Sequence, residues 1–346
     1  MRARDELTAT VKRLSREAGF ARVGIAAAGL VADAERFRQW LADGRHGTMG
    51  YLARNVAKRV RPERLVPGAR SVICLAAGYA PDDGAAAPSA PGLVARYARG
   101  RDYHKVLKRR CVRLMDRIRQ IAPGFAGRAF VDSGPVLERS LALAAGVGWI
   151  GRNCCLVVPG LGSYVCLCEI VCNLPLCPDG GLANDCSDCG ACLRACPTGA
   201  LTEGSLDARR CISYLTVEHR GPIERDLWPR MGRRLVGCDA CQEACPHNRD
   251  APPGDAELRA VRPPLGGADL AEVLLWNEAD WDAATTGSAA RRVRYDMLLR
   301  NATIAAGNSA GTDGSGRLVA ALHELKRRRP ELREPAQWAL ERLGSA

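Results

Sequence analysis

Residues 186–197 read C-S-D-C-G-A-C-L-R-A-C-P, residues 238–246 read C-D-A-C-Q-E-A-C-P, and Cys211 stands between the two blocks. The first block has the spacing C-x2-C-x2-C-x3-C-P, by which bacterial-type ferredoxins hold a [4Fe–4S] cluster with three thiolates and lend the fourth to a second cluster. The second block has one cysteine fewer, and Cys211 can supply it. The two blocks and Cys211 together provide the eight thiolates that two such clusters need.

The crossover in this spacing predicts which thiolates share a cluster. Three of them come from the first block and the fourth from the far block, so one cluster is expected on Cys186, Cys189, Cys192 and Cys245. The other cluster is then expected on Cys196, Cys211, Cys238 and Cys241. A zinc ribbon is the alternative, because C-x2-C pairs also bind tetrahedral zinc. Zinc does not require the longer run, so the spacing favours iron–sulfur clusters.

Length and composition favour an intracellular protein of several domains. The 346 residues are enough for two or three domains, and the sequence has no apolar run of membrane-spanning length and no secretory leader. We therefore expect a cytoplasmic protein without a membrane segment. In that compartment, 16 cysteines indicate metal or cluster ligation rather than disulfides.

The charge balance indicates a polyanionic partner. Lysine and arginine number 50 against 38 acidic residues, which gives a formal net charge of +12. A simple electron carrier has little need of this excess, whereas a nucleic acid would explain it through phosphate neutralisation. The alternative is an arginine-rich composition without functional meaning.

The first part of the chain alternates between predicted strands and helices. Strands are expected at residues 22–26, 71–77 and 129–131, and helices at 103–121 and about 135–145. Alternation around the sequence P-G-L-G predicts a β-hairpin from 156–158 and 163–170. Asp132 follows a predicted strand and precedes a helix, where open α/β sheets place ligand chemistry, although it could equally be a helix-capping residue.

The last part of the chain is predicted to be helical. Proline-rich segments at 252–254 and 263–267 mark a boundary, and the helices beyond it are similar to short HEAT-type repeats. Such repeats expose one long face. The basic residues expected on it are Arg291, Arg292, Arg294, Arg300 and residues 326–329.

With these pieces in place, the chain resembles the epoxyqueuosine reductases. The resemblance rests first on M-G-Y-L-A-R-N-x-x-K-R (49–59), A-R-Y-A-R-G-R-D-Y-H (95–104), V-D-S-G-P-V-L-E-R (131–139) and G-W-I-G-R-N (148–153). The cysteine blocks and R-N-A-T-I-A-A-G-N-S (300–309) also match. These motifs follow the family order over nearly the whole chain. They are far more specific than a ferredoxin run alone.

The resemblance implies a multidomain fold of α+β and α/β type. Its parts would be a cobalamin-binding α/β domain (1–178), a ferredoxin-like domain with two [4Fe–4S] clusters (179–252) and a C-terminal α-helical HEAT-like repeat that binds tRNA (265–346). The implied reaction is the two-electron reduction of epoxyqueuosine to queuosine at the tRNA wobble position. Electrons would come from an external low-potential donor and pass through the clusters to cobalamin, in a protein expected to be a monomer.

The resemblance also implies roles for individual residues. Asp132 matches the proposed proton donor, and to act as an acid near pH 7 it would need a raised pKa, which burial against the corrin ring could supply. The residues implied to contact cobalamin are Asn55, Asp132, Asn153, Ser213, Cys238 and Asp239. The residues expected to contact tRNA between the cysteine blocks are His219, Arg220 and Trp228.

Six cysteines depart from the family pattern. They are Cys154, Cys155, Cys166, Cys168, Cys172 and Cys177, and they are expected to act as small buried hydrophobes rather than as a further metal site. Two other functions compete with the reductase assignment. A corrinoid reductive dehalogenase would usually carry a twin-arginine leader and lack a helical tail. A non-catalytic cluster protein that binds nucleic acid would need neither a corrinoid nor Asp132.

Overall fold

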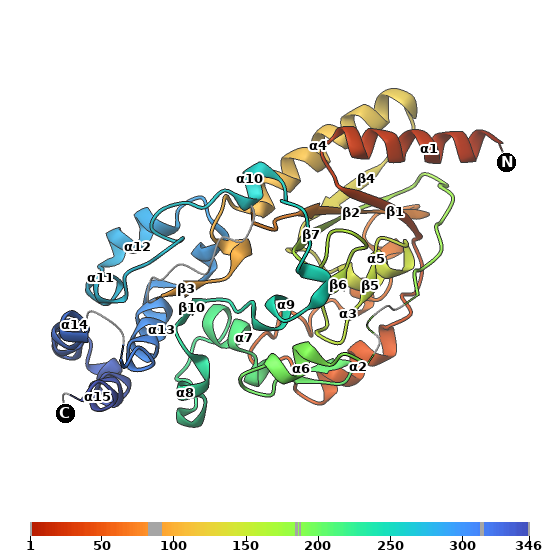
Figure 1. Cartoon of the computed structure of the whole chain (residues 1–346). Helices are drawn as coiled ribbons and strands as arrows, with labels where there is room; N and C mark the ends of the chain where they lie inside the picture. Colours follow the sequence, from red (N-terminus) through yellow and green to blue (C-terminus); the bar gives the residue numbers. More distant parts are fainter. Residues whose placement is uncertain (1, 82–91, 184–185, 187, 312–314, 345–346) are drawn as a thin grey trace.

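The computed structural model describes residues 2–81, 92–183, 186, 188–311 and 315–344. The molecule is elongated, with the N- and C-terminal ends of the chain at opposite ends (Figure 1). A β-sheet with its helices forms the N-terminal end, and a group of helices forms the C-terminal end. The short helices that carry the cluster cysteines lie along one side between them.

The N-terminal sheet has four strands in the order β1-β2-β7-β4. The strands are β1 (Arg22–Ala27), β2 (Ser71–Gly78), β7 (Val165–Cys172) and β4 (Gly127–Phe130). Every neighbouring pair is antiparallel. The predicted α/β class, which implies parallel strands, is therefore wrong for this sheet, and the α+β description applies. Because the strands of this sheet are antiparallel, the rule that places ligand sites at the carboxyl ends of parallel strands does not explain the position of Asp132.

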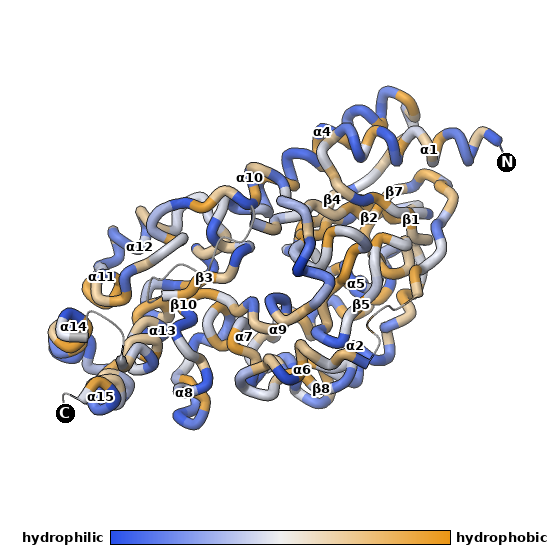
Figure 2. The backbone as a smooth tube through the Cα atoms, in the orientation of Figure 1, coloured by the Kyte–Doolittle hydropathy of each residue, from blue (hydrophilic) through white to orange (hydrophobic). Residues whose placement is uncertain are grey.

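Helices cover both faces of this sheet. One face is covered by α1 (Arg2–Glu17) and α4 (Tyr103–Ile121), and the other by α5 (Glu138–Ala144). Alternate residues of β7 divide between the two faces, so Cys168 and Ile170 pack with α4, whereas Val171 packs with α5. The blue and orange bands of α1 and α4 in Figure 2 follow this division between solvent and sheet. Helix α4 begins and ends at the predicted residues.

The predicted hairpin at 156–170 does not form. The strand β6 (Leu156–Val157) pairs with β5 (Trp149–Ile150), whereas β7 lies at the centre of the large sheet. A single antiparallel bridge pairs Val158 with Gly162, which lies in the P-G-L-G connection. The alternation of apolar residues correctly predicts strands, but it does not show which strands pair with each other.

The cluster segment consists of short elements. They are α6 (Ala191–Ala195), β8 (Leu201–Thr202), β9 (Ser205–Leu206), α7 (Ile212–Val217), α8 (Trp228–Met231), β10 (Arg234–Val236) and α9 (Ala240–Glu243). Helices α6 and α9 pack against each other. Cys196 and Cys245 follow these helices in extended conformation, as expected for residues that precede proline. Each Cys-Pro pair therefore ends its helix and turns the chain.

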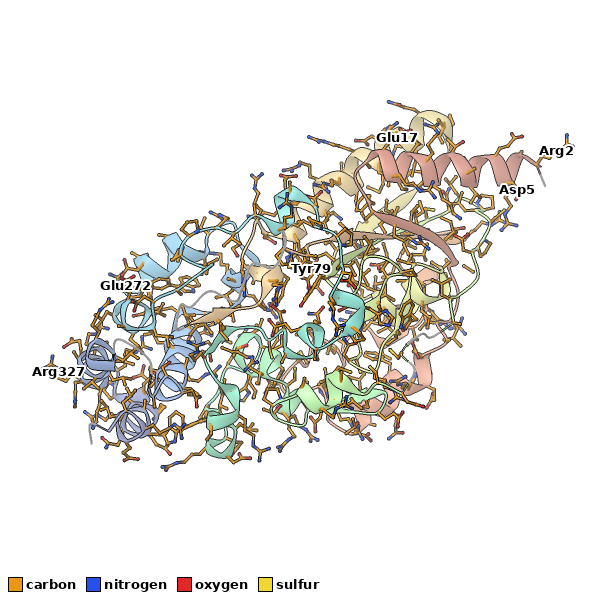
Figure 3. The ribbon with its side chains drawn as sticks, in the orientation of Figure 1. Arg2, Asp5, Glu17, Tyr79, Glu272 and Arg327 are labelled. Atoms are coloured by element: carbon orange, nitrogen blue, oxygen red, sulfur yellow. The ribbon has the colours of Figure 1, made fainter. Side chains whose placement is uncertain are left out.

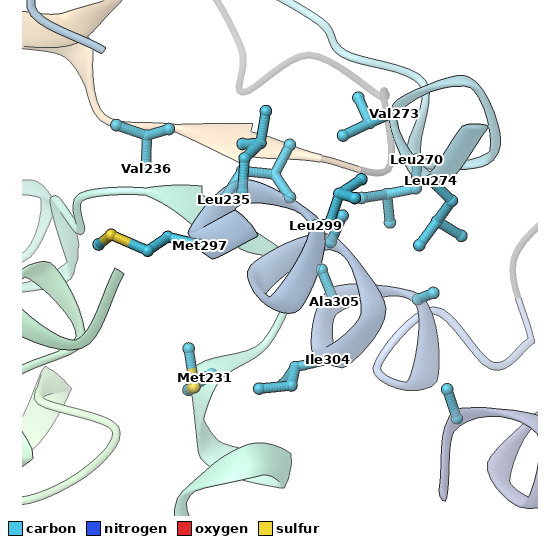
Figure 4. Packing of buried hydrophobic residues seen from close by; sticks show 14 of the residues in the cluster. Met231, Leu235, Val236, Leu270, Val273, Leu274, Met297, Leu299, Ile304 and Ala305 are labelled. Carbon is cyan, nitrogen blue, oxygen red and sulfur yellow. The ribbon is translucent and has the colours of Figure 1, made fainter. Parts of the chain in front are cut away.

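The C-terminal helices share one hydrophobic core with the cluster segment. They are α11 (Leu270–Leu275), α12 (Glu278–Thr285), α13 (Tyr295–Gly307), α14 (Ser315–Arg328) and α15 (Arg333–Arg342). Figure 4 shows Leu235 and Met231 of the cluster segment packed around α13, opposite Leu270 of α11. The strand β3 (Leu93–Val94) joins the same core by pairing with β10. Buried contacts therefore cross the expected domain boundaries.

The remaining elements are short helices on the surface of the molecule. They are α2 (Ala34–Ala42), α3 (Val56–Arg59) and α10 (Ala256–Arg259). None of the described helices is both long enough and apolar enough to cross a membrane.

Candidate active site

Asp132 lies in a tight turn between β4 and α5. Its φ of 56° is left-handed, which is uncommon outside glycine and is best tolerated by aspartate and asparagine. The amide of Ser133 closes the turn by donating to the carbonyl oxygen of Val131 at 2.5 Å. The Asp132 side chain is 56% exposed, so its carboxylate is open to a bound molecule.

The beginning of α4 supplies two hydrogen-bond partners for this carboxylate. The Tyr103 hydroxyl donates to Oδ2 of Asp132 at 2.5 Å, and Nε2 of His104 lies 3.3 Å from the same oxygen. Asp102 caps the helix by accepting from the backbone amide of His104. It also lies 2.8 Å from Nδ1 of His104, so the imidazole bridges two carboxylates.

These contacts set where the proton resides. Burial would lower the pKa of His104, but hydrogen bonds to Asp102 and Asp132 outweigh it and raise the pKa to about 9. Desolvation would raise the pKa of Asp132, but the bonds from His104 and Tyr103 lower it. The residues of the chain itself therefore lower the pKa of Asp132. Near pH 7 the proton of this pair rests on His104.

Arg292 brings the C-terminal region to the same site. Its guanidinium makes two hydrogen bonds to Glu218, at 2.8 and 2.7 Å, and stands 5.8 Å from the ring centre of Tyr51. Its positive charge also helps to lower the pKa of Asp132. The sequence predicts Arg292 only as part of the basic helical face for tRNA. It assigns no role to Tyr103 or His104, although both lie in the motif at 95–104.

The structure brings the first predicted set of cluster cysteines together. Cys186, Cys189, Cys192 and Cys245 line one pocket, together with Arg152, Asn153 and His247. Four thiols around one space match the donor set of a [4Fe–4S] cluster. Within the described ranges, no three His, Cys, Asp or Glu side chains converge closely enough to hold a single metal ion.

The second predicted set also lies together. Cys211 is close enough to Cys238 and Cys196 for their charges to affect its pKa, and Cys241 is similarly close to Cys238 and Cys211. One of the six unexpected cysteines joins this group. The Cys155 thiol forms a hydrogen bond with Cys241, which lowers the pKa of Cys155.

The other unexpected cysteines lie outside the cluster pockets. Cys166, Cys168 and Cys172 are buried in the core between β7 and α4, as expected for small hydrophobes. Cys154 is buried, and the Cys177 thiol donates to Oδ1 of Asp5 at 3.0 Å.

The residues expected to contact cobalamin have different surroundings. Asp239 is 6% exposed, and its Oδ2 accepts from the Arg96 amide at 2.8 Å, whereas its buried Oδ1 has no hydrogen-bond partner among the described residues. Asn153 lines the first cluster pocket and accepts from the Cys155 amide. Asn55 is exposed and has a left-handed backbone conformation, and Ser213 lies in α7. In the described part of the chain, no hydrogen bond joins Asn55 or Ser213 to the others.

Figure 3 shows Tyr79 near the middle of the molecule, at the end of β2. Its ring meets that of Tyr164 edge to face at 5.7 Å. The positive charge of Arg96 lies 5.1 Å from the Tyr164 ring centre, and its Nη1 donates to Oδ2 of Asp239 at 3.2 Å. Aromatic rings therefore connect the sheet to the region of Asp239.

Two of the residues expected to contact tRNA are buried. Trp228 is 5% exposed, donates to the carbonyl oxygen of Ile223 at 2.8 Å and packs against Trp338, so it cannot stack on a base. Arg300 is 7% exposed and donates to backbone carbonyls of the cluster segment, including Leu215 at 2.7 Å. Its role is structural. His219 is half-buried, and Arg220 is exposed.

Comparisons with known proteins cover nearly the whole chain. Residues 59–133 match the model of the family described as epoxyqueuosine reductase QueG, DUF1730, and residues 185–248 match a 4Fe-4S double cluster binding domain. A curated epoxyqueuosine reductase of Pseudomonas aeruginosa is 42% identical, over 98% of this chain and 95% of that protein.

Solved structures agree over the same length. An epoxyqueuosine reductase crystallised with an epoxyqueuosine-modified stem loop of tyrosine tRNA has a TM-score of 0.88 and 29% identity, over 98% of this chain and 90% of that one. A Bacillus subtilis relative has a TM-score of 0.86 and 28% identity, over 98% of this chain and 90% of that one. That structure is described with its catalytic aspartate loop swung out of the active site.

Proposed function

The chain belongs to the epoxyqueuosine reductase family, and on that premise we propose that it reduces epoxyqueuosine to queuosine in tRNA. The reaction takes up two electrons and two protons, breaks both carbon–oxygen bonds of the epoxide and releases the oxygen as water. The protein is an oxidoreductase with two [4Fe–4S] clusters. The observation that carries the proposal is the hydrogen-bonded group of Tyr103, His104 and Asp132, which holds a proton beside an open site.

Asp132 and His104 together act as the acid of this reaction. The proton resides on His104 near pH 7, and Asp132 lies between the imidazole and the open site. As negative charge develops on the epoxide oxygen, the Asp132 carboxylate can take the proton from His104 and pass it to that oxygen. Tyr103 fixes the carboxylate orientation by its own hydrogen bond.

The second cofactor in the proposal is cobalamin. Its corrin ring carries amide side chains that donate hydrogen bonds, and the unpartnered buried Oδ1 of Asp239 is an acceptor for one. The residues proposed to hold it are Asn55, Asp132, Asn153, Ser213, Cys238 and Asp239. When bound, cobalamin would supply a cobalt centre that collects the single electrons delivered by the clusters.

The substrate is recognised as an RNA. The basic excess of the chain and Arg292, which stands beside the Asp132 site, support a tRNA surface that runs from the site onto the C-terminal helices. The proposed domains remain the cobalamin-binding domain (1–178), the cluster domain (179–252) and the HEAT-like repeat (265–346). A monomer in the cytoplasm, supplied by an external low-potential electron donor, completes the proposal.

The Asp132 loop is proposed to move during turnover. A Bacillus subtilis relative is described with its catalytic aspartate loop swung out of the active site, and the corresponding segment here is the turn at 131–137. A turn that moves can admit the tRNA and then bring Asp132 to the epoxide.

Mass spectrometry of nucleosides tests the proposal. Purified protein is reduced with dithionite and incubated with tRNA that carries epoxyqueuosine, with and without added cobalamin. We expect loss of one oxygen from the modified nucleoside, dependent on cobalamin. Unchanged epoxyqueuosine, with both clusters and cobalamin shown to be bound, would contradict the proposal.

A further inference from the structure

A second pair of carboxyl groups, Glu138 and Glu169, lies behind the Asp132 turn. Glu169 is at the middle of the sheet, on β7, between Cys74 of β2 and Phe130 of β4. Its side chain is on the α5 side of the sheet and is 0% exposed, and in the described part of the chain the side-chain hydrogen bond that affects its pKa comes from the carboxyl group of Glu138. An ionised carboxylate in that position is strongly disfavoured because it loses its solvation by water. Burial raises the pKa of Glu169 well above its ordinary value.

Glu138 is the polar group that meets Glu169. It is the first residue of α5, and burial together with the charge of Asp132 raises its pKa to about 7. Two ionised carboxylates only accept hydrogen bonds, so Glu138 and Glu169 can bond to each other only when one of them carries a proton. The carboxyl pair therefore holds at least one proton at neutral pH.

The carboxyl pair is attached to the backbone of Asp132. Oε1 of Glu138 accepts from the Asp132 amide at 2.6 Å. A left-handed conformation is unfavourable for a residue with a Cβ atom and persists only where its surroundings hold it. The bond from Glu138 is the contact that acts on the Asp132 backbone itself, whereas Arg59 holds the turn further on, at the carbonyl of Gly134.

We propose that Glu138, supported by Glu169, is a positioning residue that holds the Asp132 turn in the conformation that presents its carboxylate to the substrate. This inference rests on the proposed role of Asp132 as proton donor. While the pair shares its proton, Glu138 is fixed between Glu169 and the Asp132 amide. When the last proton leaves, the two carboxylates repel each other and the turn is released.

Charged and titratable groups surround the pair on several elements. They are Asp132 on the turn, Arg139 on α5, Arg59 on α3, Cys74 on β2, Cys111 on α4, and Cys166 and Cys168 on β7. Burial raises the pKa of Cys74, Cys166 and Cys168, so these thiols stay neutral across the range in which Glu138 titrates. His104, whose pKa is about 9, contacts the Asp132 side chain, whereas the carboxyl pair contacts the Asp132 backbone amide.

Hydrogen–deuterium exchange of the segment 128–137 tests this inference without substrate or cofactor. After correction for intrinsic rates, Glu138→Ala should exchange the Asp132 amide roughly tenfold faster or more, as expected for loss of a hydrogen bond to a half-buried acid. Glu138→Gln keeps the acceptor and adds a donor toward Glu169, so it should restore protection. The matched control is Glu278→Ala, which changes the exposed first residue of α12 and should exchange like the unaltered protein.

The pH dependence separates a positioning role from general stability. In the unaltered protein, protection of the Asp132 amide should persist while Glu138 loses its proton near pH 7, because Glu169 keeps the last proton of the pair, and it should fall only at higher pH, whereas Glu138→Gln should remain protected. Wild-type protection in Glu138→Ala, with the fold intact by circular dichroism, would overturn the inference.

Activity provides an independent measurement on the same variants. With epoxyqueuosine tRNA, Glu138→Ala should lower kcat about tenfold or more, because the turn presents the acid to the bound substrate, and Glu138→Gln should restore it. Equal kcat in Glu138→Ala and the Glu278→Ala control would contradict the inference. If the unaltered protein does not turn over this substrate, the proposed function fails, and the exchange experiment still decides whether the carboxyl pair holds the turn.

Discussion

The cluster segment and the Asp132 site are held together by different forces. Between residues 186 and 246, short helices and Cys-Pro turns place the thiols, and the buried residues of that segment belong to a core built largely by the C-terminal helices. The Asp132 site depends on a four-stranded sheet, a capped helix and hydrogen bonds between distant residues. The first region is expected to need its metal to stay folded, whereas the second is formed by the protein alone.

Removal of iron should have the largest effect and should separate the two regions. The intact protein is expected to carry about eight irons, and Cys192→Ser should lose the cluster to which that thiol is assigned, leaving about four. Complete chelation should abolish turnover and increase proteolysis within 186–246, while the sheet stays protected. Iron is measured by chemical assay after anaerobic purification.

Cys177→Ser is the control for the iron measurement, because Cys177 bonds to Asp5 and not to the cluster cysteines. Its iron content should equal that of the unaltered protein. About four irons in the unaltered protein, with zinc also bound, would show that the ligand assignment is wrong.

Substitution of Asp132 should affect chemistry and leave the cluster segment intact. Asp132→Asn cannot pass on a proton, so the rate of single turnover should fall by about 10²–10⁴. Iron content and cobalamin binding should stay unchanged. The control is Asp116→Asn on the exposed side of α4, where the only partner in the described structure is Arg119. An unimpaired Asp132→Asn would remove Asp132 from the role of acid.

Neutralising basic residues near the site should have the smallest effect. Arg291, Arg292 and Arg294 are already paired with Asp282, Glu218 and Asp296, so release of these partners offsets part of what each gains from a phosphate. Changing all three to glutamine should weaken tRNA binding by roughly tenfold or less and flatten its salt dependence. Fluorescence anisotropy across a salt series measures both.

A control for charge alone is Arg13→Gln, which lies on α1 at the far end of the molecule. Equal tRNA affinity in this control and in the triple variant would show that the tRNA surface does not include Arg292. Arg300 is unsuitable for such a test because it is buried, and its substitution is expected to destabilise the protein instead.

The two regions also differ in how far the sequence predicts them. Cluster ligands follow one another within a few residues, so spacing alone was enough to group Cys186, Cys189 and Cys192, and the ferredoxin crossover supplied Cys245. Asp132 was found by its motif. The sequence does not predict its partners. His104 reaches Asp132 from α4, and Glu138 meets Glu169, whose position follows from the pairing of β4 with β7.

Sheet topology was the main error. Apolar strand patterns at 22–26 and 71–77 predict strands but not whether neighbours run parallel or antiparallel, since buried strands read alike in both. Likewise, the aromatic side chain of Trp228 gives no sign of whether it faces solvent or Trp338. These features are decided by contacts between segments distant in the sequence.

The pH dependence of single turnover tests the central claim, that His104 and Asp132 together hold the transferred proton. Since hydrogen bonds raise the pKa of His104 to about 9, the rate should stay level near neutral pH and fall as the pH rises through about 9. In His104→Gln the proton must reside on Asp132 alone, so the fall should shift to lower pH and the rate near neutral pH should drop by about 10². The same profile and rate in both proteins would contradict the account.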